Sequence, residues 1–167
     1  MKAFVLSQFN YCPLVWMVHS RELNNRINRI HQSALRIAYK DQQSTFQELL
    51  DKDGAVTIHH RNIQILATEI YKFMHNLSPK IMGEVFKLND SKHNLRVDAP
   101  FASKNIRTVH YGLQSIGYLA PRIWILIPKN IKESPSLKSF KKAIRQWIPY
   151  GCPCRLCQQY VQGLGFI

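Results

Sequence analysis

Three cysteines crowd into six residues near the end of the sequence, and these are Cys152, Cys154 and Cys157. Thiolates are preferred ligands of structural Zn²⁺, which takes four ligands in a tetrahedron. The C-x-C-x-x-C run offers three of them, and the neighbouring cation Arg155 is expected to lower their pKa. The fourth ligand would be Cys12, a histidine from earlier in the fold such as His110, or a group from another molecule. Free thiols or an incomplete zinc knuckle are the alternative interpretation of the same run.

The other residues that could do chemistry form no recognisable site. His59 and His60 are adjacent, and on a helix they would point about 100° apart, so the pair is not expected to chelate one ion. No nucleophile lies in a glycine-framed motif, no glycine loop suits a phosphate, and no acidic cluster could hold two metal ions. We therefore predict no catalytic residue.

Basic residues dominate the charge, with 23 Lys and Arg against 10 Asp and Glu and a formal net charge of +13. An excess of this size favours a polyanionic partner, with nucleic acid first and a membrane surface second. No stretch reaches the roughly 18 consecutive apolar residues that a spanning helix needs. We predict nonspecific contact with RNA or DNA by eight residues on two helices: Arg26, Arg29, Arg36, Lys40, Lys138, Lys141, Lys142 and Arg145.

The first of these helices is predicted over residues 22–40. Its apolar residues recur at steps of four, three, four and three, which is the spacing of one helical face: Leu23, Ile27, Ile30, Ala34 and Ile37. At 100° per residue, the four basic residues of this helix fall within an arc of about 80° beside the apolar stripe. Such a ridge can follow phosphates, and a solvated face without a ligand is the alternative.

Three further helical segments are predicted from caps and periodicity. Ser44 with Gln47 forms a capping-box pattern that opens a short helix, and Gly54 is expected to end it. Residues 57–77 repeat a helical stripe through Ile63, Leu66, Ile70, Phe73 and Leu77. Ser78-Pro79 then opens a short segment that runs to about Phe86.

The second half of the chain is less regular. Residues 89–111 are polar and lack a helical stripe, so they are predicted to be a linker or extended arm. The β-branched and aromatic residues of 106–128 favour short strands before a turn near Pro121. Ser134-Pro135 then opens a last helix with apolar residues at steps of three, four and three before Pro149: Leu137, Phe140, Ile144 and Trp147.

These patterns predict a mainly α fold with a less regular or short-stranded middle. The predicted regions are a helical part at 1–88, the arm at 89–111, a small subdomain ending in a helix at 112–149, and a cysteine-containing tail at 150–167. Polar residues interrupt the apolar start of the chain and no small-residue cleavage site follows, unlike a secretory signal. Crowded cysteines are also unlike a disulfide framework. We expect an intracellular protein, nuclear or cytoplasmic.

Several stretches in this order resemble the C-terminal region, downstream of the palm, of the reverse transcriptase polyprotein of jockey- and CR1-like non-LTR retrotransposons. The resemblance covers nearly the whole chain and rests on residues 7–41, 57–73, 77–86, 94–96, 105–128, 136–149 and 152–167. It implies that residues 1–88 are a thumb-like helical region, and that the tail helps to hold element RNA and target DNA.

The enzymatic motifs of that family do not carry over to this chain. The paired aspartates of the polymerase and the acids and histidines of the endonuclease are absent, so the resemblance implies no enzyme activity for this chain alone. Related elements carry a CCHC knuckle, whereas here no histidine follows the three cysteines. The alternatives are a helical interaction or scaffold module, or an expressed remnant without function.

Overall fold

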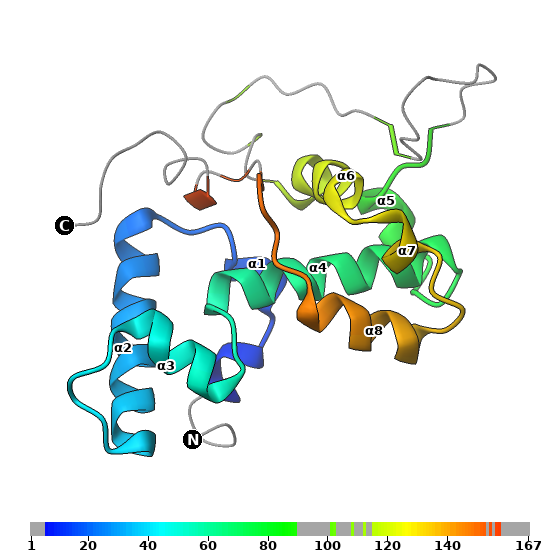
Figure 1. Ribbon diagram of the computed structural model, residues 1–167. Coiled ribbons are helices and arrows are strands. Elements are labelled where there is room, and N and C mark those ends of the chain that lie inside the picture. Colours follow the sequence, from blue (N-terminus) through cyan, green and yellow to red (C-terminus); the bar gives the residue numbers. More distant parts are fainter. Residues whose placement is uncertain are drawn as a thin grey trace. The chain divides into compact units, whose positions relative to one another are not determined.

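A computed structural model describes residues 6–89, 101, 102, 108, 112, 115–152, 154, 156 and 157 (Figure 1). The predicted mainly α fold is confirmed, and the described residues contain no strand beyond an isolated bridge between Leu88 and Phe101. The elements in chain order are η2 (Gln8–Asn10), α1 (Pro13–Trp16), α2 (Arg21–Tyr39), α3 (Phe46–Asp53), α4 (Ile58–Met74), α5 (Met82–Val85), α6 (Ile116–Leu126), α7 (Lys129–Lys132) and α8 (Leu137–Gln146).

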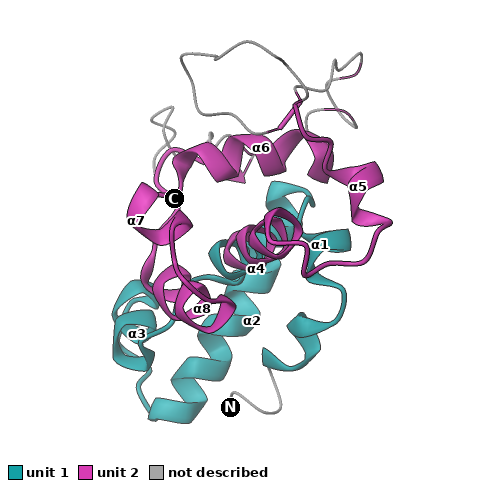
Figure 2. Ribbon diagram, turned by 90° about the vertical axis from the view of Figure 1, so that its right-hand side faces the viewer, with its two compact units in different colours: residues 1–62 teal, residues 63–167 magenta. Residues whose placement is uncertain are grey.

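The chain divides into two compact units, Met1–Asn62 and Ile63–Ile167 (Figure 2). The boundary falls inside α4, which is one continuous helix from its first turn in the first unit to its later turns in the second. The first unit contains α2 and α3. The second contains most of α4 and all of α5 to α8, together with the cysteines of the tail.

The long helix predicted at 22–40 is confirmed as α2. Ser20 caps its start by accepting a hydrogen bond from the Leu23 amide, and Lys40 ends it in the left-handed conformation. The side that α2 buries is not the apolar stripe, since its buried residues are Asn24, His31 and Leu35. Leu35 forms a core with Leu49 and Leu50 of α3, so α2 and α3 pack on each other.

The stripe predicted on α2 is instead largely exposed. Leu23, Ile30 and Ile37 expose 46%, 56% and 75% of their surface. Periodicity identifies which residues share a helical face, but it does not say which face another element covers. The first unit therefore uses one side of α2 for its core and covers its apolar side only in part, since Ile27 and Ala34 are half-buried.

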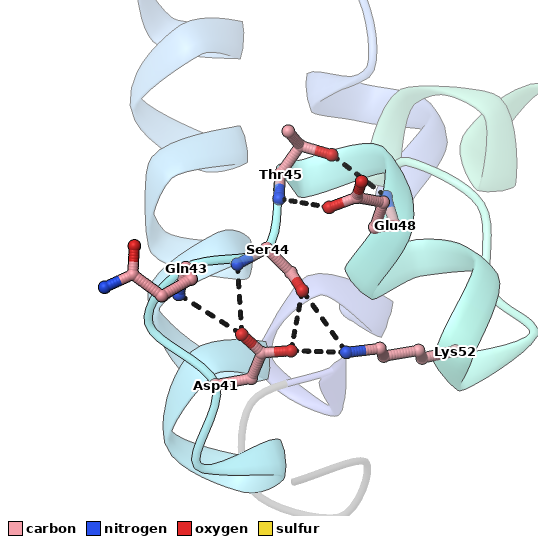
Figure 3. A network of polar contacts seen from close by, with 6 residues as sticks. All are labelled: Asp41, Gln43, Ser44, Thr45, Glu48 and Lys52. Atoms are coloured by element: carbon pink, nitrogen blue, oxygen red, sulfur yellow. Dashed lines mark hydrogen bonds and ion pairs between the residues drawn. The ribbon is translucent and has the colours of Figure 1, made fainter.

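A polar network sets the turn between α2 and α3 (Figure 3). The Asp41 carboxylate accepts hydrogen bonds from the Gln43 and Ser44 amides and from the Ser44 hydroxyl, and it pairs with the Lys52 ammonium. Because Asp41 engages Ser44, the predicted box of Ser44 and Gln47 does not form. Thr45 and Glu48 form the capping box one residue later. The predicted stop at Gly54 is confirmed by its left-handed conformation.

The second unit is built around α4. The predicted stripe residues Ile63, Leu66 and Ile70 are fully buried. An aromatic cluster lines the unit, made by Tyr71, Phe73, Phe86, Phe101, Trp124 and Phe140. The segment predicted to open at Ser78-Pro79 begins with turns, and its helix α5 starts only at Met82.

The strands and the turn predicted around Pro121 are wrong for the residues that the structure describes there. Helix α6 runs through Pro121 and buries Leu119, Ala120, Ile123 and Trp124. Proline in a helix interior costs about 3 kcal/mol. Burying a single large apolar side chain stabilises the fold by about 1.5–3 kcal/mol. The burial of several such side chains on α6 therefore outweighs the cost of the proline. Of 106–114, only Thr108 and Gly112 lie within the described residues.

The last predicted helix is confirmed as α8, although it starts after Ser134-Pro135. Ser136 caps it by accepting a hydrogen bond from the Ser139 amide. Ser134 stays outside because its hydroxyl donates to the Ile131 carbonyl and its own carbonyl accepts from Tyr71. Phe140 and Ile144 form the buried face of α8.

Replacing Asp41 by Asn tests the network at the start of α3. Hydrogen bonds from Lys52 and Ser44 hold the pKa of Asp41 well below its usual range. The folded protein therefore favours the carboxylate form. Ionised Asp41 adds to the free energy of unfolding above pH of about 4, and this contribution declines as the pH falls further. We expect Asp41→Asn to lower the melting temperature at pH 7, and the difference from the parent to narrow below pH of about 4. Glu84→Gln, an exposed change, is the control; a pH-independent difference for Asp41→Asn contradicts the account.

Candidate metal centre and basic faces

The three cysteines of the tail lie together in the second unit. Cys152 and Cys154 are buried and Cys157 is half-buried. The Cys157 amide donates to the Cys154 sulfur at 3.4 Å and to the Cys154 carbonyl at 3.1 Å, which turns the chain so that both thiols face one point. The three thiols that the sequence offers as zinc ligands therefore lie close together.

Crowding raises the pKa of the Cys152 and Cys157 thiols. The Cys154 side chain and then burial raise the pKa of Cys152 to about 12, against an opposing hydrogen bond from Cys157. Hydrogen bonding with Cys152 and with Cys154, followed by burial, also raises the pKa of Cys157. For Cys152 and Cys157 the expectation of a lowered pKa is therefore wrong, because the neighbouring sulfurs have the largest effect. Arg155 lies outside the described residues.

His59 completes a group of four ligands with the cysteines. One ring nitrogen of His59 and the three sulfurs all lie within 4.8 Å of one another. In a tetrahedral zinc site with bonds of about 2.3 Å, neighbouring ligand atoms are about 3.8 Å apart, so the group needs only a small contraction. Three sulfurs with one imidazole nitrogen are also a common donor set of structural zinc. The residues present therefore fit a zinc ion.

His59 reaches this position because it lies in the register of the buried stripe of α4. It precedes Ile63 by four residues, and Leu66 and Ile70 follow at steps of three and four, so His59 shares their helical face. His59 is 6% exposed, whereas His60 lies about 100° around the helix and is only half-buried. The sequence prediction considered His59 and His60 only as a pair and so missed His59 as a single ligand. The helical period of α4 nevertheless indicated that His59 shares the buried face.

The sequence predicted other sources for the fourth ligand, namely Cys12, a histidine such as His110, or another molecule. Cys12 is exposed and does not belong to the group. His110 lies outside the described residues. No local spacing links His59 to the cysteines, which follow about 90 residues later along the chain.

Two buried polar side chains of α4 bring the tail to this place. The Tyr71 hydroxyl donates to the Ser134 carbonyl at 2.7 Å, and its ring stacks on Phe140 at 4.2 Å. Further toward the start of α4, the Gln64 amide donates to the carbonyls of Arg145 and Trp147 at 3.3 and 2.9 Å. The chain from Ser134 to Trp147 therefore runs antiparallel to α4 and continues toward the cysteines.

The basic face predicted on α8 is present and exposed. Lys138, Lys141, Lys142 and Arg145 fall within an arc of about 100°, and every charged residue of this helix is basic. The opposite side carries the buried residues Phe140 and Ile144. One side of α8 thus attaches the helix to the second unit, and the other presents an uninterrupted positive surface.

The basic face on α2 belongs to the first unit. Arg26, Arg29 and Lys40 are exposed, and Arg36 is half-buried. Glu22 is the one acidic residue of this helix. The two faces lie in different units.

Gln64→Leu tests how the end of α8 is held. The substitution leaves the Arg145 and Trp147 carbonyls without this donor, so we expect the free energy of unfolding to fall by about 1–3 kcal/mol. Gln146→Leu changes an exposed residue at the end of α8 and is expected to stay within about 0.5 kcal/mol of the parent. Urea denaturation followed by circular dichroism measures both; equal stability of the two variants contradicts the anchoring role of Gln64.

No protein-family model, curated protein or solved structure matches this chain. Within the described part of the chain, no helix is both long enough and apolar enough to cross a bilayer. What bears on function is therefore the geometry of the cysteine and histidine group and the charge carried by α2 and α8.

Proposed function

We propose that this chain is a nucleic-acid-binding module whose tail is fastened by zinc. The observation that carries the proposal is the exposed face of α8, which has four cations and no acidic residue. Together with the formal charge of +13, such a face is suited to the phosphates of RNA or DNA. Contacts to phosphate carry no sequence information by themselves, so the binding is nonspecific.

The sequence resemblance gives this proposal its biological setting. We propose that the chain corresponds to the part of a non-LTR retrotransposon reverse transcriptase that follows the palm, with element RNA or target DNA as its ligand. The catalytic aspartates of such a polymerase are missing from the sequence, so the proposed role is binding without polymerisation. A nuclear or cytoplasmic location is part of the same proposal.

In this proposal zinc is structural. His59, Cys152, Cys154 and Cys157 would hold the ion, and four protein ligands leave no open position for a reacting water. The bound ion would supply a cross-link between the first turn of α4 and the segment that follows α8. The chain's own residues already prepare that link, because Gln64 and Tyr71 align α8 along α4.

A salt titration tests the phosphate contacts of α8. Each phosphate neutralised on a single strand contributes about 0.7 to the slope of log K against log salt. We expect the double change Lys141→Gln with Lys142→Gln to weaken binding to single-stranded RNA and to reduce the slope by up to about 1.4. The control, Lys80→Gln with Lys87→Gln, removes the same charge from exposed residues elsewhere and is expected to leave the slope nearly unchanged.

The outcome of that titration is decisive in both directions. Binding that does not weaken with salt rules out phosphate contact as its basis. Equal losses in the two double variants would show that net charge matters and that the face of α8 does not.

Zinc content tests the metal centre. We expect one zinc per chain in purified, reduced protein, and an absorption band from cobalt–thiolate bonds when cobalt replaces zinc. His59→Ala is expected to release zinc at lower chelator concentration, whereas the neighbouring change His60→Ala retains the behaviour of the parent. Because bound metal adds to folding free energy, chelation should also lower the melting temperature of the parent and of His60→Ala. Elemental analysis and thermal denaturation measure these effects.

Two results would overturn the metal proposal. One is parent protein that takes up no zinc when folded and reduced. The other is His59→Ala protein that holds zinc as tightly as His60→Ala does, which would remove His59 from the ligand set while leaving the cysteines in question.

A further inference from the structure

Helix α2 carries an apolar stripe whose three largest outward residues are exposed. Leu23, Ile30 and Ile37 are exposed, while the packing against α3 is made through Leu35. These three large aliphatic side chains lie in line on one helix face, with the half-buried Ile27 and Ala34 between them, and so differ from isolated surface residues. An exposed apolar surface of this kind is expected to be an interaction site.

The shape of the stripe indicates another helix as its cover. Its members recur at steps of four, three, four and three, which is the 3.5-residue period of a coiled-coil seam. At 100° per residue the stripe spans only about 80°, which is narrower than the apolar face of a helix that packs into a core. It also contains no aromatic residue, whereas helices that lie in a membrane interface usually bury Trp or Phe.

Charge beside the stripe indicates the character of that helix. Arg26 lies at the edge of the stripe, and Arg29 and Arg36 form the next row on the same side. The opposite edge is occupied by Asn24 and His31, which are buried. A helix seated on the stripe therefore meets positive charge along its one open edge.

We infer that α2 is a docking surface for an acidic amphipathic helix of a partner protein. Such a helix would place aliphatic residues between Leu23, Ile30 and Ile37, and its Glu or Asp side chains against Arg26 and the neighbouring arginines. A second copy of this chain fits less well, because pairing α2 with itself brings cations against cations or against neutral residues. Nucleic acid offers no apolar surface to match the stripe.

A designed peptide tests the inference on the full chain. The probe is a labelled three-heptad peptide with Leu at the seam positions and Glu beside them, and its counterpart carries Lys in place of Glu. Like charges keep each peptide from pairing with itself. Fluorescence anisotropy is expected to show binding of the Glu peptide and at least about tenfold weaker binding of the Lys peptide, since one lost charge pair and one new repulsion act together.

Two variants connect the binding to α2. Ile30→Gln with Ile37→Gln is expected to weaken binding of the Glu peptide at least about tenfold, because burying one such side chain is worth that factor or more. Arg26→Glu is expected to weaken the Glu peptide and to strengthen the Lys peptide. Lys80→Glu, which makes the same charge change at an exposed site elsewhere, is the control and leaves the preference unchanged. Circular dichroism verifies that each variant is folded.

Other outcomes overturn the inference. Equal binding of the two peptides, or no binding of the Glu peptide, removes the acidic helix as the occupant. Sedimentation that shows a dimer in the parent and a monomer in Ile30→Gln with Ile37→Gln assigns the stripe to a second copy. Loss of binding to anionic phospholipid vesicles in that variant assigns it to a membrane. The α8 variant Lys141→Gln with Lys142→Gln should keep peptide binding, so failure of the nucleic-acid proposal remains distinguishable.

Discussion

The burial of α4 is the constraint on which the second unit depends. A buried helix favours partners for the polar groups it carries, because an unpaired buried donor costs about 1–3 kcal/mol. Three of the buried polar side chains of α4 meet the last part of the described chain. Tyr71 and Gln64 bond the carbonyls before and after α8, and His59 joins the cysteines that follow. The polar residues of a buried helix thus determine the path of the chain over its last described residues.

The helices that the sequence predicted are those that local preferences favour, and in α4 and α8, unlike α2, tertiary packing covers the face that the pattern marks. In α2, α4 and α8 the apolar residues repeat at the helical period, so their existence and approximate ends could be found without a structure. In α6 the preferences disagree, because Pro121 and the β-branched residues around it favour other conformations locally. Its helix depends on the burial of Ile123 and Trp124 in the finished unit, and no local pattern reports that burial.

The grouping of the candidate metal ligands was half predictable for a related reason. Three ligands lie within one short run, so their spacing alone gathered them, whereas His59 comes from another helix far away in the sequence. Its place in the stripe of α4 indicated that it would be buried, but not what it would meet. The same limit applies to α2, where the sequence identified an apolar side and could not show that Leu35, on a different side, provides the core contact.

The distance along the chain between His59 and the cysteines has a consequence for folding. Any ion that the four residues hold together closes a loop of about 90 residues, and a covalent link across a loop of that size removes conformational freedom worth roughly 4.7 kcal/mol from the unfolded chain. The contacts of α4 with the two ends of α8 span 63 and 83 residues, which is nearly the same distance along the chain. An ion held by the four residues would therefore stabilise the same long-range arrangement as Tyr71 and Gln64, by restricting the unfolded chain where those side chains form bonds in the folded one.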